Sequence, residues 1–281
     1  MVIAPVLWST AGVVTRHMEA ARPLELAFWR SLFCALCVAT VLVAVHRHRV
    51  PAVLRGVGLP GLLSGAMWAI MFTCFIIALR FTSTANVLVV CSLGPLCTAL
   101  LARLVLREPI PARTWIAILV AAAGMTAMFA SGFAATGLRD LAGMLLALTV
   151  PLAAAVNVVT LRKAAASVDL VPAVFIGAAC SALFTLPWAL PVEATSHDLL
   201  LLAFLGVFQV GLPCMLLVLA SRTLPAPEIA LLGLLEVVLG TLWAWLGAAE
   251  TPALATLAGG TLVLVALAGN AFLGWRRTRP T

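Results

Sequence analysis

The chain consists almost entirely of apolar segments, each about as long as a lipid bilayer is thick. Ten such segments are separated by short clusters of charged residues, and a helix of about 20 residues crosses the ~30 Å hydrocarbon core of a bilayer. Every backbone amide in hydrocarbon needs an internal partner, so these segments are expected to be helices. The predicted spans are residues 2–18, 25–45, 58–79, 83–104, 112–131, 139–160, 171–191, 198–219, 226–247 and 252–274. The sequence therefore predicts an all-α polytopic membrane protein with ten transmembrane helices.

The composition indicates that lipid is the main solvent and excludes other classes of protein. Hydrophobic residues make up 64% of the chain and charged residues 10%, against about 45–50% and 25% in soluble domains. No extramembrane domain fits, because the longest polar gap runs only from His46 to Arg55. The net charge of +7 is spread over many short loops, so it cannot form the basic face that a nucleic acid requires. The lipid bilayer is the expected partner, and no nucleic acid is.

Arginine is distributed unevenly between the two sets of loops. An even number of spans puts both termini on one side, and that side carries twelve basic residues against five on the other. The positive-inside rule then predicts that both termini are cytoplasmic. The 16 arginines against one lysine are typical of a bacterium with a GC-rich genome, so we expect the cell (inner) membrane. The first span begins without a preceding tail, and we therefore expect the native N-terminus to lie further upstream.

The second half of the chain repeats features of the first. Residues 78–108 align with residues 220–250 at a shift of 142 positions. The matching positions include Arg80 with Arg222 and Glu108 with Glu250. A second similarity, at a shift of 145 for its first three residues, relates Val13-Val14-Thr15-Arg16 to Val158-Val159-Thr160-Leu161-Arg162. A unit of five spans begins on one side of the membrane and ends on the other, so its copy must enter inverted. The sequence thus predicts two inverted five-helix repeats, residues 1–131 and 139–275, an arrangement that recurs in secondary transporters.

Glu236 is the most informative side chain, because it lies near the middle of the ninth predicted span. An ionised carboxylate at that depth costs about 3 kcal/mol on insertion scales, so it must find a partner, face water or hold a proton. Gly233 and Gly240 share its helical face, and the matching face of the first half is also small, formed by Cys91, Gly94 and Thr98. Two small faces that meet would leave a cavity with one carboxylate in its wall. Glu236 is therefore a candidate for substrate or proton handling, with the proton as the candidate coupling ion; the alternative is a neutral Glu that joins helices.

Four further polar residues within spans are candidates for the substrate or proton pathway. Asn86 lies in the first turn or two of the fourth span, after Thr82-Ser83-Thr84. Asn157 and Gln209 are each interpreted as hydrogen-bonding contacts between helices or as contacts in a binding site. Arg30 lies about a turn inside the second span and has three possible roles. It can extend to the outer surface, pair with Glu25, or bind an anionic substrate.

Several tryptophans lie within spans and not at their ends. Trp8 is a candidate site residue, and Trp68, Trp243 and Trp245 have similar positions. Aromatic walls with few polar groups suit amphipathic or amino-acid-like substrates. Large rings are also ordinary components of a helix-bundle core, so both interpretations stay open.

Several short motifs resemble those of EamA-type domains in the drug/metabolite transporter superfamily. They are Leu7–Gly12, Leu26–Arg30, Gly94-Pro95 and the helix-ending Arg107-Glu108, with a second Glu at position 250. The resemblance covers essentially the whole chain as two tandem domains, and it implies export of a small metabolite or drug-like compound. Members of this family often carry Glu-Pro on the ninth span, whereas Glu236 is followed here by Val237. The helix kink implied for both halves is therefore expected in only one.

Intramembrane enzymes carry sequence patterns that this chain lacks. A metalloprotease would need a His-Glu-x-x-His helix, which the four histidines do not form, and the acids are too isolated to bind magnesium pyrophosphate. No metal or cofactor is expected, and no Gly-rich phosphate loop supplies ATP chemistry. The sequence predicts an alternating-access secondary transporter of a small amino-acid-like or drug-like molecule, and the family resemblance implies export. A lipid or isoprenoid-carrier flippase is the alternative, followed by an intramembrane enzyme.

Overall fold

The structure is a computed structural model that describes residues 1–15, 17–129, 137–248 and 254–278. Nine helical stretches within these ranges are long and apolar enough to cross a membrane, and a shorter apolar stretch, Ile3–Thr15, precedes them. The regular structure of the described residues is entirely helical. The prediction of an all-α polytopic membrane protein is therefore confirmed. The first span is shorter than the predicted residues 2–18.

The helices follow the predicted spans closely. In chain order they are α1 (Ile3–Trp8) and α2 (Ala11–Thr15); α3 (Pro23–His46); the 3-10 turn η1 (Arg47–Arg49) with α4 (Val50–Gly56); α5 (Gly58–Phe81); α6 (Thr84–Cys91), α7 (Gly94–Leu101) and the π-helical η2 (Ala102–Leu106); α8 (Ala112–Phe129); α9 (Leu138–Ala164); α10 (Val171–Ala189); α11 (Ser196–Phe204), the π-helical η4 (Leu205–Gly211) and α12 (Leu212–Ala220); α13 (Ala226–Gly233) and α14 (Leu235–Ala248); and α15 (Leu254–Thr278).

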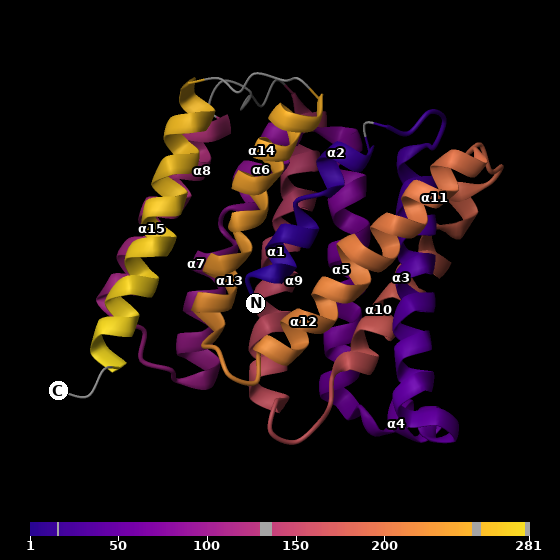
Figure 1. The fold of residues 1–281 in the computed structure, drawn as a ribbon, viewed down its shortest axis with the longest axis horizontal. Coiled ribbons are helices and arrows are strands. Elements are labelled where there is room, and N and C mark those ends of the chain that lie inside the picture. The colour runs from indigo at the N-terminus through magenta and orange to yellow at the C-terminus, as the bar shows by residue number, and fades with distance from the viewer. Residues whose placement is uncertain (16, 130–136, 249–253, 279–281) are drawn as a thin grey trace.

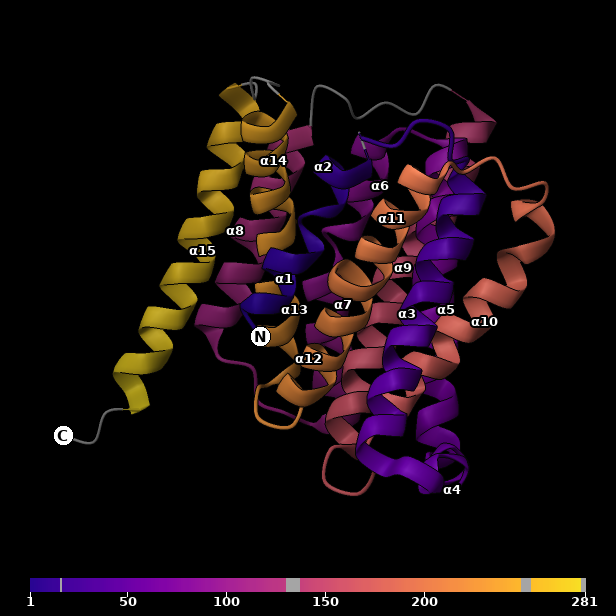
Figure 2. The same ribbon diagram turned by 45° about the vertical axis from the view of Figure 1, so that its right-hand side comes forward.

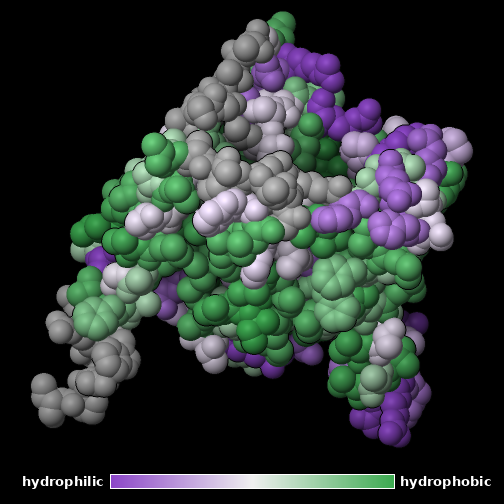
Figure 3. Space-filling view, turned by 45° about the horizontal axis from the view of Figure 1, so that its top comes forward, coloured by the Kyte–Doolittle hydropathy of each residue, from purple (hydrophilic) through white to green (hydrophobic). Residues whose placement is uncertain are grey.

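Large apolar side chains cover the outside of the bundle. Leu59, Leu138 and Leu254 are 79%, 87% and 85% exposed, which would be costly in water over so many positions. Figure 3 shows hydrophilic residues gathered toward the ends of the molecule, with a mostly hydrophobic face between them. This distribution is the one expected for a bundle whose sides contact lipid.

The spans are arranged as two flanks with interrupted helices between them. Helices α8 and α15 lie together at one flank and α3, α5 and α10 at the other, in both views (Figures 1 and 2). Successive spans run in alternate directions, so α4 and the end of α15 lie at the same end of the bundle (Figure 1). That end carries the arginine-rich connections, and we call it the Arg-rich end.

Helix contacts follow a symmetric scheme between the halves. The second span packs against the seventh (α3 with α10), the fifth against the tenth (α8 with α15), and the fourth against the ninth (α7 with α13). The third span contacts the sixth (α5 with α9), and correspondingly the eighth contacts the first (α12 with α1). Each of these contacts therefore either joins equivalent spans or has an equivalent contact in the other half.

Three spans are interrupted near their centres. The fourth breaks at Ser92–Leu93 and the ninth at Leu234, and the first breaks between α1 and α2. The expectation of a kink in only one half is wrong. Pro95 removes a backbone donor in the fourth span. In the ninth span, the N–H groups of Leu234 and Val237 bond to carbonyls three residues back, next to Gly233, a poor helix former.

Helices α6 and α13 coincide at the shift of 142 positions predicted from the repeat. Arg16 and Glu250 of that repeat lie outside the described residues.

Helices α8 and α15 approach each other through two glycines. A Cβ atom on Gly259 would clash with the carbonyl oxygen of Gly124, and one on Gly124 would lie 2.7 Å from the carbonyl oxygen of Gly259. Both clashes involve backbone, which cannot move aside as a flexible side chain can. The two helices therefore pack closely only because both positions lack a side chain.

The substitution Gly259→Val is expected to destabilise the protein by about 1–3 kcal/mol, the usual cost of overpacking. The measurement is the midpoint of thermal unfolding in detergent. Gly269→Val is the matched control, since it lies on the same helix and a Cβ there would have no neighbour within 4 Å. Equal midpoints for the two variants would contradict the close-packing interpretation.

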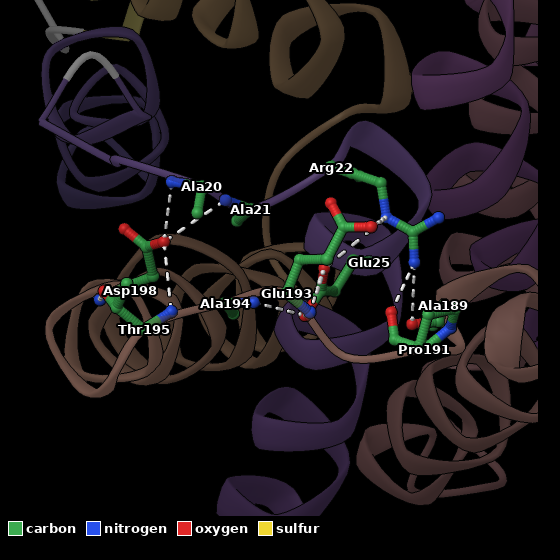
Figure 4. Close-up of polar contacts among 10 residues, drawn as sticks. All are labelled: Ala20, Ala21, Arg22, Glu25, Ala189, Pro191, Glu193, Ala194, Thr195 and Asp198. Atoms are coloured by element: carbon green, nitrogen blue, oxygen red, sulfur yellow. Dashed lines mark hydrogen bonds and ion pairs between the residues drawn. The ribbon is translucent and has the colours of Figure 1, made fainter.

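At the end opposite the Arg-rich end, two buried carboxylates hold two loops (Figure 4). Asp198, in the first turn of α11, accepts hydrogen bonds from the backbone N–H groups of residues 19, 20 and 21, at 2.8, 3.0 and 3.2 Å. Glu25, in the first turn of α3, accepts from the backbone N–H groups of Glu193 and Ala194, with closest distances of 3.1 and 2.9 Å. Each acid thus holds the loop that leads into the other acid's helix. We call this arrangement the carboxylate clasp.

Candidate functional site

Two adjoining cavities lie at the centre of the bundle, where the helices are interrupted. The larger has a volume of about 700 Å³ and the smaller about 330 Å³. The residues that line both are Trp8, Ala11, Arg30, Phe75, Leu88, Glu236 and Val237. The larger cavity extends to Ala21, Pro23 and Arg80, which lie at the end of the bundle opposite the Arg-rich end.

The smaller cavity lies between the two small faces identified in the sequence. Cys91, Gly94 and Thr98 line one side and Gly233 and Glu236 line the other. A Cβ atom on Gly233 would meet nothing within 4 Å. The predicted cavity with a carboxylate in its wall is therefore present, and these small residues leave open space between the spans.

Glu236 is held at the cavity wall by the break in the ninth span. It lies in the first turn of α14, where the helix dipole favours a negative charge. The indole Nε1 of Trp243 donates to Ser9 Oγ at 2.9 Å, and this bond ties α14 to the break in the first span. Within the described part of the chain, no hydrogen bond or ion pair engages the Glu236 carboxylate. Its side chain is partly exposed and available to a ligand in either cavity.

Arg30 is the buried cation of the same cavities. It is only 8% exposed, and Nη2 lies 3.4 Å from the carbonyl oxygen of Phe72. Two roles considered for it are wrong: it does not extend to the surface, and Glu25 belongs to the carboxylate clasp. Arg30 and Glu236 line the same two cavities, although no ion pair within 4 Å joins them among the described residues. The cavities thus hold a cation and an anion that are near each other and not paired.

The other candidates divide between the cavity and the helix contacts. Asn157 and Gln209 both line the smaller cavity; Asn157 also accepts a 2.7 Å bond from Ser64, and Gln209 donates to the carbonyl oxygen of Trp8 at 3.4 Å. Gln209 lies in the π-helical η4 and caps a carbonyl near the break in the first span. Asn86 lies outside the lining of either cavity. It is fully buried, and its amide donates to Thr82 at 2.7 Å.

The tryptophans considered in the sequence also separate by position. Trp8 lines both cavities and Trp68, 1% exposed, lines the smaller one. Trp245 is 46% exposed and takes no part in the lining. Aromatic surface therefore reaches the cavities from the first and third spans.

Ion pairs join the chain at the Arg-rich end. Arg162 lies 3.2 Å from Glu108, and it also donates to the backbone carbonyl of Arg222 at the end of the eighth span. Arg113 lies 3.8 Å from Glu228. Both pairs connect the first half of the chain to the second. Sequence reasoning missed these pairs and the carboxylate clasp; the available signal was the position of each acid at a helix terminus.

The sequence profile described as the EamA-like transporter family matches this chain twice, over residues 1–130 and 141–272. This chain belongs to the EamA-like transporter family. As a member, it is a multi-pass membrane transporter. The resemblance inferred from the motifs is confirmed.

Similar proteins extend this result. The chain is 26% identical over 271 residues to the pseudopaline exporter CntI of two Pseudomonas aeruginosa strains, UCBPP-PA14 and PAO1. Each match covers 94% of this EamA-like chain and 92% of the relative. A solved crystal structure shares 20% identity with it and superposes with a TM-score of 0.81, over 99% of this chain and 96% of the other. At that identity the structural likeness shows the fold alone.

Proposed function

We propose that this EamA-like chain is a secondary transporter that exports a small zwitterionic, amino-acid-like metabolite by alternating access. The observation that carries the proposal is the presence of two opposite charges, Arg30 and Glu236, in the central cavities. In the described structure these two side chains form no ion pair with each other. Arg30 would bind the carboxylate of the substrate and Glu236 its ammonium group, while Trp8, Phe75 and Leu88 contact its apolar part. A cavity of about 700 Å³ is in the usual range for small-ligand sites.

The proposed mechanism depends on two inverted repeats, residues 1–131 and 139–275. The symmetric helix contacts and the matching breaks in the fourth and ninth spans support the repeat. The first span runs away from the Arg-rich end and the sixth runs toward it (Figure 1), as inversion requires. Two inverted halves can exchange conformations, and the exchange opens a central site first to one side and then to the other.

The direction of transport and the membrane location are inferred from the distribution of arginine and from the names of the relatives. We infer that the Arg-rich end faces the cytoplasm, by the positive-inside rule, so that the protein lies in the cell (inner) membrane with both termini inside. In the structure the larger cavity then extends toward the outer side, and the inner side is joined by ion pairs. The relatives are named as exporters, which supports export here. The proton is the proposed coupling ion, with Glu236 as its carrier.

The test is transport by purified protein in liposomes loaded with labelled amino acids, with and without an imposed pH gradient. Efflux at least tenfold above protein-free liposomes is expected for one or more of them, and a favourable gradient should increase it. The methyl ester and the N-acetyl derivative of a transported compound should each move about tenfold less, because each lacks one charge recognised by the site.

The same preparation distinguishes the alternatives. Scrambling of labelled lipid without solute flux would replace this proposal by the flippase. Chemical conversion of a compound would indicate an enzyme. Equal transport of the parent compound and both derivatives would contradict recognition by Arg30 and Glu236.

A further inference from the structure

A separate pocket lies on the outside of the bundle, at the end opposite the Arg-rich end. Its volume is about 330 Å³, and the ends of four helices form it. Leu24 comes from the start of α3, Arg80 and Phe81 from the end of α5, Arg139 from the start of α9, and Trp188 from the end of α10. These helix ends place the pocket at the level where the hydrocarbon core meets the headgroups.

Two arginines in this pocket lack acidic partners. Among the described residues, neither Arg80 nor Arg139 lies within 4 Å of a carboxylate, and the segment 130–136 that precedes α9 contains no acid. The other outer-side arginines that the structure describes are engaged elsewhere: Arg22 pairs with Glu193 at 3.3 Å, and Arg30 lies in the central cavities. Arg80 and Arg139 thus line the same pocket, and neither has a carboxylate partner in the described structure.

Local contacts fix the position of Arg139. Its Nη2 donates to the carbonyl oxygen of Arg80 at 2.9 Å, and its guanidinium lies 6.0 Å from the centre of the Phe81 ring. Arg139 is in the first turn of α9, where the helix dipole favours an anion and disfavours a cation. Asp140, the next residue, does not line the pocket. An anion at this position would offset both the charge of the arginines and the dipole.

The flank of the pocket is suited to lipid. Phe184 and Trp188 on α10 are 55% and 53% exposed, their rings are 5.3 Å apart, and the neighbouring Leu183 is 70% exposed. Aromatic residues of this kind concentrate at membrane interfaces. We propose that this pocket binds an anionic phospholipid, with the headgroup phosphate between Arg80 and Arg139 and the acyl chains along the exposed face of α10.

This site adjoins the transport cavity without belonging to it. Arg80 lines both the surface pocket and the larger central cavity. A bound headgroup would therefore lie beside the outer opening of that cavity. The proposal stands whether or not the transported molecule is a zwitterion, because it depends only on the outer pocket and its charges.

The test is lipid retention by the full-length protein in detergent, measured by native mass spectrometry during titration with phosphatidylglycerol. Arg80→Gln/Arg139→Gln should lose one tightly bound lipid, with affinity for it reduced at least tenfold, since the variant lacks both charges that attract the headgroup phosphate. Arg47→Gln/Arg49→Gln, which removes two arginines at the Arg-rich end, is the matched control and should retain that lipid.

Three results would overturn the proposal. They are equal retention by the wild-type and Arg80/Arg139 variants, equal binding of phosphatidylcholine, and an equal loss of the tight lipid in the control. Displacement of the lipid by millimolar inorganic phosphate would indicate a site for free anions and would also count against it. If the double variant does not fold, Arg80→Gln alone tests the same contact, and an unchanged affinity in that variant would contradict the proposal.

Discussion

Replacing Glu236 with glutamine should reduce transport by about 100-fold or more, while the amount of protein in the membrane stays the same. The carboxylate is the anionic group in the walls of the two central cavities as the structure describes them. Its loss would leave the ammonium group of a substrate unpaired and the charge of Arg30 uncompensated, and truncation of one partner in such a pair costs about 2–5 kcal/mol. The measurement is initial efflux rate per reconstituted molecule.

Glu228→Gln is the control for this variant. Glu228 lies in the first turn of α13, does not line either central cavity, and pairs with Arg113 at 3.8 Å with its side chain 31% exposed. Its removal should change transport by less than about threefold, because the Glu228 carboxylate lies outside the lining of both cavities. Undiminished efflux by Glu236→Gln from mildly acidic to mildly alkaline pH would exclude Glu236 as the proton carrier.

The sequence predicted the parts of this structure that depend on hydropathy and spacing. The spans follow from apolar length, because hydrocarbon permits only internally bonded backbone. The central cavity follows from the small faces around Gly94 and Gly233, because a missing side chain at a helix contact leaves space that helical periodicity locates. The prominence of Glu236 follows from the cost of a charge at mid-membrane.

Features that depend on contacts between distant residues were not predictable. Arg30 is one turn from the start of its span, and spacing alone cannot distinguish a side chain that reaches the surface from one that turns into a cavity. Asn86 and Asn157 look alike in sequence, yet Asn86 bonds within its own helix end and Asn157 lines the smaller cavity. The break at Leu234 has no adjacent proline from which it could have been predicted. Each outcome is decided by which helices become neighbours.

The substitution Asp198→Ala should have the largest effect on stability, with a loss of about 2–4 kcal/mol. Asp198 is fully buried and accepts bonds from the N–H groups of three residues in the 19–21 loop. It also forms a capping box with Thr195 at the start of α11. Alanine would leave these donors unsatisfied, and each unsatisfied buried donor costs about 1–3 kcal/mol before water relieves part of the loss. The expected fall in the thermal midpoint in detergent is about 5–15 °C.

Asp169→Ala is the matched control, because Asp169 is 41% exposed and its 3.0 Å pair with Arg222 lies at the surface; its midpoint should change by no more than a degree or two.

The double variant Asp198→Ala/Glu25→Ala separates two views of the carboxylate clasp. If each acid only satisfies the N–H groups of the loop that it binds, the losses of stability in the two single variants add. The clasp is reciprocal, however, so release of the 19–21 loop also disturbs the start of α3 on which Glu25 sits. The double variant should therefore lose at least about 0.5 kcal/mol less than the sum of the single losses, and strict additivity would show that the two loops are held independently.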